Sequence, residues 1–145
     1  MKIRRAEDGF GPLGWDQDAL PRPLREGQGR TGVALEVLAQ GRDLVVRVTG
    51  GAAHVGAVAV CAGRSMADHA GPAGQVLVVP GHREGTLAAE TAEAVARATG
   101  CTCAAVVGIH QDDATPAEIH AIVANVRAAV ARLTEALRGG REEKR

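Results

Sequence analysis

The chain has 145 residues, with 17 basic and 17 acidic side chains and a formal net charge of zero. Because binding to nucleic acid or to an anionic membrane surface depends on clustered basic charge, this composition argues against both partners. The length predicts one domain. Phe10 and Trp15 are the only aromatic residues, so we expect an aliphatic core that offers no ring to stack on a flat ligand.

Three cysteines, at positions 61, 101 and 103, occur in a chain that shows no apolar export signal after its first residues. This pattern indicates a reduced compartment rather than a disulfide framework. No apolar run approaches the ~20 residues that cross a bilayer. We therefore expect a cytoplasmic protein.

Residues 1–30 combine many glycines and prolines with scattered charges and show no apolar period. This segment is interpreted as a flexible amino-terminal arm. Residues 31–138 form the single predicted domain, and residues 139–145 form a solvated tail.

The predicted strands begin with a hairpin, in which residues 33–40 and 43–50 flank the two-residue connection Gly41-Arg42. A third strand is predicted over 54–61. After a loop, two further strands are predicted over 75–79 and 101–109.

The predicted helices follow the fourth and fifth strands. The first lies within "TLAAETAEAVARATG", which has one apolar face and ends at Gly100. The second begins at "TPAE", residues 115–118, where Thr115 and Glu118 form a capping box around a first-turn proline. It is expected to run to about Arg138 and to stop at Gly139. It packs on the sheet or, as an alternative, against a second subunit.

These elements predict an α/β fold of the two-layer α+β kind. Its mixed sheet of about five strands comprises a β-hairpin, a third strand and a βαβ unit, with two main helices, the last long and C-terminal. The crossover leaves the fourth and fifth strands parallel, so His82 and His110 follow strand ends at one edge. If the third strand runs antiparallel to the fourth, His54 joins them there.

Three histidines at one edge predict a metal or ligand site, since neutral imidazoles suit zinc, copper or iron and three protein ligands leave a coordination position open. Each histidine alone is more often a cap or a surface residue than a ligand. Glu84 could orient an imidazole or simply lie as a charge near a helix start. No catalytic motif with a paired nucleophile and base occurs, so hydrolase or transferase chemistry has no residue-level support.

Three segments, "GGAAHVGAVAV", "VVPGHREGTLAAETAEAVARATG" and "VVGIHQDDATPAEIHAI", resemble in order and spacing the small D subunit of gallate and hydroxyarylic acid decarboxylases, the LpdD-like family. The similarity covers about residues 33–135. The resemblance implies a chaperone of prenylated FMN that is accessory to UbiD-type decarboxylases, with a fold similar to small proteasome-assembly chaperones and a tendency to form a homodimer. His54, His82, Glu84 and His110 match the family segments.

The hypothesis is therefore a non-catalytic accessory subunit in which His54, His82 and His110 bind a metal. The flavin ring would rest on aliphatic side chains, on the backbone at Gly50 and Gly51, or on a partner subunit. Its phosphate would lie near a helix start, at residues 81–86, which include Gly81, Arg83 and Glu84, or near Thr115. Two alternatives stay open: an interaction module that assembles with the decarboxylase without binding the cofactor, and a small metal-dependent enzyme.

Overall fold

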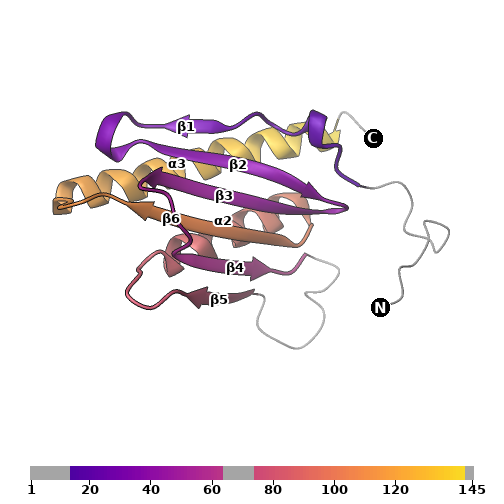
Figure 1. The fold of residues 1–145 in the computed structure, drawn as a ribbon. Coiled ribbons are helices and arrows are strands. Elements are labelled where there is room, and N and C mark those ends of the chain that lie inside the picture. The colour runs from indigo at the N-terminus through magenta and orange to yellow at the C-terminus, as the bar shows by residue number, and fades with distance from the viewer. Residues whose placement is uncertain (1–13, 64–73, 143–145) are drawn as a thin grey trace.

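The computed structural model of the chain describes residues 14–63 and 74–142, with the side chains described as far as residue 140. These residues form one mixed six-stranded sheet with two α-helices packed against one of its faces (Figure 1). The strands are β1 (Leu24–Glu26), β2 (Val33–Gln40), β3 (Asp43–Gly51), β4 (Ala57–Cys61), β5 (Gly74–Val78) and β6 (Cys103–His110), and the helices are α2 (Gly85–Thr99) and α3 (Pro116–Glu142). The predicted fold class is confirmed, with one strand more than the five expected.

The order of the strands across the sheet is β1-β2-β3-β6-β4-β5. β2 and β3 form the predicted antiparallel hairpin, and β6 lies parallel to β3. β4 is antiparallel to both β5 and β6, so β5 and β6 point the same way, as their helical crossover predicts. The crossover passes over β4, which separates the two strands.

The core lies between the sheet and the helices. Alternate residues of the four central strands point into it and are buried, because successive side chains of a strand face opposite sides: Val33, Leu35 and Val37 on β2, Leu44, Val46 and Val48 on β3, Ala105 and Val107 on β6, and Ala57 and Ala59 on β4. α2 covers β4, β5 and β6, whereas α3 covers β1 and β2 and packs against α2. The alanines on β4 and β6 let α2 lie close to the sheet. No helix among the described residues combines the length and apolarity needed to cross a membrane.

Residues 14–30, predicted as part of a flexible arm, lie on the domain instead. Two short 3-10 helices, η1 (Gln17–Ala19) and η2 (Gly29–Thr31), flank β1, which pairs with β2. α3 stabilises this segment, since Arg132 bonds the carbonyl of Arg25 at 3.0 Å and the carboxylate of Glu26 at 2.8 Å. The sequence did not predict β1, because a three-residue strand is too short to show an alternating pattern and because its partner on α3, Arg132, is distant in sequence. Residues 1–13, the rest of the predicted arm, fall outside the described residues.

The end of α2 and the start of α3 lie where the sequence predicted them. Gly100 ends α2 in the left-handed conformation with φ 72°. At α3, Thr115 Oγ1 accepts from Glu118 N at 3.1 Å and Glu118 Oε2 accepts from Thr115 N at 2.9 Å, so the capping box is confirmed. The predicted stop at Gly139 is wrong, because Gly139 keeps a helical conformation and α3 continues to Glu142.

Two predicted strands begin too early. β4 starts at Ala57 rather than His54, which lies in the preceding loop, and β6 starts at Cys103 rather than Cys101. The loop holding His54 passes directly over Gly108, where a Cβ atom would overlap the His54 carbonyl group. His54 is therefore outside the strand ladder and free to point toward the adjacent loops.

Candidate functional site

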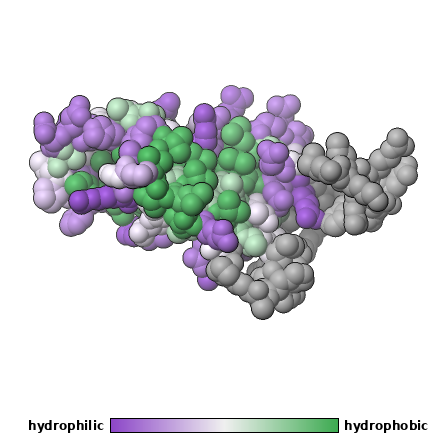
Figure 2. Space-filling view, turned by 60° about the horizontal axis from the view of Figure 1, so that its bottom comes forward, coloured by the Kyte–Doolittle hydropathy of each residue, from purple (hydrophilic) through white to green (hydrophobic). Residues whose placement is uncertain are grey.

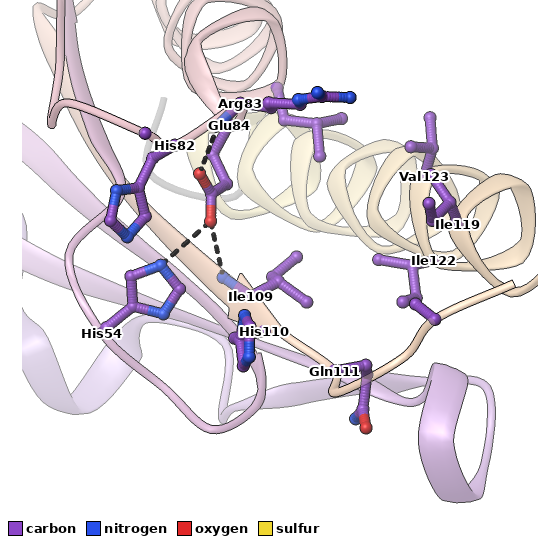
Figure 3. Close-up of a pocket in the computed structure, with 13 residues that line it drawn as sticks. His54, His82, Arg83, Glu84, Ile109, His110, Gln111, Ile119, Ile122 and Val123 are labelled. Carbon is purple, nitrogen blue, oxygen red and sulfur yellow. Dashed lines mark hydrogen bonds and ion pairs between the residues drawn. The ribbon is translucent and has the colours of Figure 1, made fainter. Parts of the chain in front are cut away.

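Three histidines from three different loops meet at one end of the sheet (Figure 3). His54 comes from the loop between β3 and β4, His82 from the loop between β5 and α2, and His110 from the end of β6. The ring centroid of His54 lies 4.7 Å from that of His82 and 6.3 Å from that of His110. The predicted convergence is confirmed, and it depends on the antiparallel direction of β4 relative to β5 and β6.

Glu84 connects the loops that carry these histidines. Its Oε1 accepts from His54 Nε2 at 3.0 Å and from the backbone N–H of Ile109 at 3.3 Å, and its Oε2 accepts from the backbone N–H of Arg83 at 3.0 Å. The residue is 9% exposed. Gly56 makes room for it, because a Cβ atom there would lie 2.5 Å from the carboxylate carbon.

These contacts keep Glu84 ionised although it is buried. Burial alone raises the pKa of the carboxyl group, but the backbone N–H bonds and the adjacent His54 outweigh it, so that the pKa lies below its ordinary value. A carboxylate bonded to the His54 loop, to the end of β6 and to its own loop fixes their relative positions. Glu84 is thus the structural centre of the site.

The hydrogen bonds of the histidines bear on the predicted metal. His54 Nδ1 lies 3.1 Å from the carbonyl oxygen of Ala52 and its Nε2 faces Glu84, so both ring nitrogens are occupied by acceptors. His82 Nδ1 lies 3.1 Å from the Pro80 carbonyl oxygen, and His110 Nε2 lies 2.9 Å from Asp112 Oδ1. A metal ligand needs a free nitrogen lone pair. His54 offers none in this arrangement.

A metal centre therefore does not fit the site as it stands. Within residues 14–63 and 74–142, no group of three His, Cys, Asp or Glu side chains is arranged to hold a metal ion. The geometry gives no support to zinc, copper or iron bound by His54, His82 and His110. It favours imidazoles that act as hydrogen-bond donors and as polar contacts.

A pocket of about 510 Å³ opens beside the histidines. Its two sides differ, since the histidines and Glu84 lie on one side and the first turns of α3 on the other (Figure 3). Five large aliphatic side chains also line it: Leu87, Ile109, Ile119, Ile122 and Val123. An apolar hollow of this volume with a few convergent polar groups is typical of a site for a small organic ligand.

The positive charge in the lining comes from a single basic side chain. Arg83 is the one Lys or Arg among the residues that line the pocket. The starts of both helices already hold carboxylates of the chain itself, Glu84 at α2 and Glu118 at α3. An anionic group of a ligand would meet like charge at either helix start, so Arg83 is the better partner for it.

Gly50 and Gly51 lie apart from this pocket. They line a separate hollow of about 310 Å³ together with residues of β1, η2 and β2. In the sheet Gly50 pairs with Ile109 and Gly51 with His110. Gly51 has φ 59°, and a Cβ atom there would overlap the carbonyl group of His110. These glycines permit close pairing behind the site and do not line the histidine pocket.

The sequence interpretation missed the apolar side of the pocket. Ile119, Ile122 and Val123 belong to the apolar positions of the final predicted helix, which were interpreted as a face that packs on the sheet or against a second subunit. One signal was available in the sequence: Ile119 lies in the first turn of the predicted helix and follows the His110 loop directly. In the structure Ile119 is 50% exposed. The roles of Gly56 and Gly108, which admit Glu84 and the His54 loop, gave no signal that separates them from other strand glycines.

Comparison with protein families identifies the chain. The family described as prenylated flavin chaperone LpdD-like domain matches residues 27–138. This match spans β2 to β6, α2, most of α3 and every residue that lines the pocket. A search among curated proteins gave no match. The chain belongs to the LpdD-like family of prenylated flavin chaperones.

Proposed function

We propose that the chain binds prenylated FMN in the histidine pocket and transfers it to a UbiD-type decarboxylase, acting as a non-catalytic accessory protein. The observation that carries this proposal is the pocket itself, which is built from the three segments that resemble the family. It combines an aliphatic side with a rim of imidazoles, and an isoalloxazine has the matching chemistry: a flat apolar ring with a polar edge.

The lining residues suggest how each part of the cofactor would be recognised. Ile109, Ile119, Ile122 and Val123 would cover the ring, since no aromatic residue lines the pocket. The remaining ring nitrogens of His82 and His110, Nε2 and Nδ1, would bond to polar atoms at the edge of the ring. Arg83 would bind the phosphate, because a guanidinium pairs with phosphate through two parallel N–H bonds.

When bound to the decarboxylase, the prenylated flavin supplies the electron sink for decarboxylation. The residues of this chain hold the cofactor, shield one face of the ring from water, and release it to the enzyme. Binding through hydrogen bonds and aliphatic contacts is reversible, as transfer to a partner requires. Metal is not needed for any of these steps.

The proposal is tested by measuring retention of prenylated FMN under anaerobic conditions. Replacing Arg83 by Gln, or His54, His82 and His110 together by Ala, should lower the bound flavin at least tenfold. His120→Ala is the matched control, because His120 is exposed on the first turns of α3 and does not line the pocket. Unchanged retention in both pocket variants would reject the site.

Elemental analysis of the same samples tests the metal question separately. The hydrogen bonds of His54 predict less than one transition-metal ion per chain and no difference between wild type and the histidine variant. A stoichiometric metal that disappears in the histidine variant would contradict the hydrogen-bond arrangement described above. A colourless wild-type protein that binds the decarboxylase would instead support the interaction module without cofactor.

A further inference from the structure

Among residues 14–63 and 74–142 no strand pairs with the outer side of β5, and this edge has the composition of an interior strand. All residues of β5 are exposed, with Leu77 at 78%, Val78 at 46% and Val76 at 41%, and Val79 beyond it is 40% exposed. Residues 74–79 contain no charge and no proline. Edge strands that face solvent usually carry charges, prolines or bulges that prevent pairing with another chain. β5 has none of these.

Both faces of β5 are apolar. Val76 and Val78 point toward α2, where their side chains lie near Gly85. Leu77 points to the opposite face of the sheet and stands beside Val58, which in turn pairs with Val106. Strands with two apolar faces are typical of the middle of a sheet.

An uncharged surface continues from β5 across the face of the sheet that the helices leave open. The row that begins at Leu77, Val58 and Val106 is followed by a second row containing Val60, which is 45% exposed, and Ala104. Figure 2, which turns the β5 side of the molecule forward, shows hydrophobic residues gathered there. The nearest ion pair on this face, Arg47 with Glu36, lies on β3 and β2.

The other edge of the sheet is protected. β1 has only three residues, two of them the charged Arg25 and Glu26, and Pro23 precedes it. Arg132 of α3 bonds both the backbone and the side chain of this strand. The two edges of one sheet therefore differ in whether they can accept a further strand.

The backbone of β5 has a defined set of free groups. The N–H of Val79 donates to the carbonyl of Gly56 at 2.8 Å, which makes Ala57 and Val78 a non-hydrogen-bonded pair in the antiparallel ladder. By alternation, Leu77 bonds to β4, whereas the N–H and C=O groups of Val76 and Val78 point away from the sheet. These are the groups that a further strand would bond.

We propose that β5 pairs antiparallel with β5 of a second copy of the chain, so that two sheets join into one across a two-fold axis. A two-fold axis places side chains near it against their own copies, and like charges there would repel. Residues 74–79 meet that condition because they carry no charge. A surface without charges gives little electrostatic selection for a different protein. The pockets lie outside the strand pairing, so each copy keeps its own.

Sedimentation equilibrium of Val76→Pro tests the arrangement. Because the Val76 N–H points outward, proline there removes no bond within the chain and is tolerated at an edge, yet it breaks the ladder to the second copy. We expect the wild type at twice the 14.9 kDa chain mass and Val76→Pro with a dimer dissociation constant raised at least tenfold. Val76→Thr, which keeps the N–H and the branched shape, should remain dimeric. Circular dichroism verifies that each variant is folded.

Amide hydrogen exchange on the wild type provides the second measurement. The amides of Val76 and Val78 should be protected at concentrations where the dimer forms and should exchange at least tenfold faster on dilution, while that of Leu77 stays protected in both. A monomeric wild type, or a dimer whose Val76 and Val78 amides exchange rapidly, would overturn the proposal. So would protection that appears only when a decarboxylase is added. Flavin binding measured on Val76→Pro should equal that of wild type, so a failure of this interface is separable from a failure of the pocket.

Discussion

The two ends of the sheet are built from the same strands and serve different purposes. At one end the loops around His54, His82 and His110 leave polar groups facing a pocket. At the other end Cys61 and Cys103 pair across β4 and β6, and all three cysteines are buried and free of disulfides. One end thus opens to a pocket, whereas the other, the closed end, is buried.

The closed end satisfies its polar groups internally. Thr102 N donates to Asp43 Oδ1 at 2.9 Å, and Gly63 N donates to Thr102 Oγ1 at 3.1 Å. Burial raises the pKa of the Cys103 thiol to about 12, so this thiol stays neutral and acts as a small apolar side chain. Substitutions at the closed end should lower stability without changing ligand binding. Substitutions at the pocket should weaken ligand binding and change stability little.

Leu44→Ala, at the closed end, should have the strongest effect. Leu44, at the start of β3, is 1% exposed, and its replacement removes buried methyl groups and leaves a cavity. We expect a loss of about 2–5 kcal/mol in the free energy of unfolding, measured by urea denaturation. Flavin affinity of the folded fraction should not change. A loss of affinity at temperatures where the variant is fully folded would show that the two ends are not independent.

Glu84→Gln should affect both properties, because Glu84 connects the loops of the open end. Loss of charge-assisted hydrogen bonds should lower stability at pH 7 by about 1.5–3 kcal/mol and weaken flavin binding. Its pKa in the folded protein lies below the unfolded value of 4.5, so the stabilisation is present above that value and is lost as the pH falls through the folded pKa. The stability curves of wild type and Glu84→Gln should therefore converge in acid. Curves that stay parallel from pH 7 to pH 3 would contradict this role.

Ile119→Ser tests the apolar side of the pocket without disturbing the core. Ile119 is half exposed in the free protein, so its replacement should change stability little. Loss of the aliphatic contact should weaken flavin binding roughly tenfold, equivalent to ~1.4 kcal/mol. Titration of flavin fluorescence measures the change, with His120→Ser as the neighbouring control. Equal affinities in the two variants would place the ring elsewhere.

A smaller change is expected at the start of α3. Thr115→Ala removes the cap and should cost ~1 kcal/mol of stability, seen as a lower midpoint in thermal unfolding. Thr115→Asp should restore most of it, since aspartate also caps helices well. Flavin affinity should stay within twofold of wild type in both variants. A large loss of affinity in Thr115→Ala alone would assign the cap a part in shaping the pocket.

Local signals in the sequence predicted the elements and their directions. The capping box at Thr115 and the glycine at position 100 each mark a boundary through neighbouring residues, and the β5-α2-β6 crossover fixes two strand directions. From these directions the meeting of His82 and His110 followed, and His54 joined them on the condition that the third strand runs antiparallel to the fourth. That part of the candidate site was predictable without coordinates.

Long-range pairing was not predictable in the same way. The insertion of β6 between β3 and β4, and the attachment of β1 through Arg132, depend on contacts between distant residues. Two partners of Glu84, His54 and the Ile109 backbone, likewise lie 25 or more residues from it in sequence, and its place depends on the missing side chain of Gly56. The hydrogen bonds that occupy both nitrogens of His54 could not be deduced from its position in the sequence, and they leave this histidine no lone pair for the predicted metal.

A backbone amide NMR titration of the protein with prenylated FMN, under anaerobic conditions, would locate the bound cofactor residue by residue. We predict the largest shift changes at residues 81–84, 109–111 and 119–123, which surround the pocket, and none at the cysteine end. Changes confined to the hollow around Gly50 and Gly51, or no changes at saturating cofactor, would contradict binding in the histidine pocket.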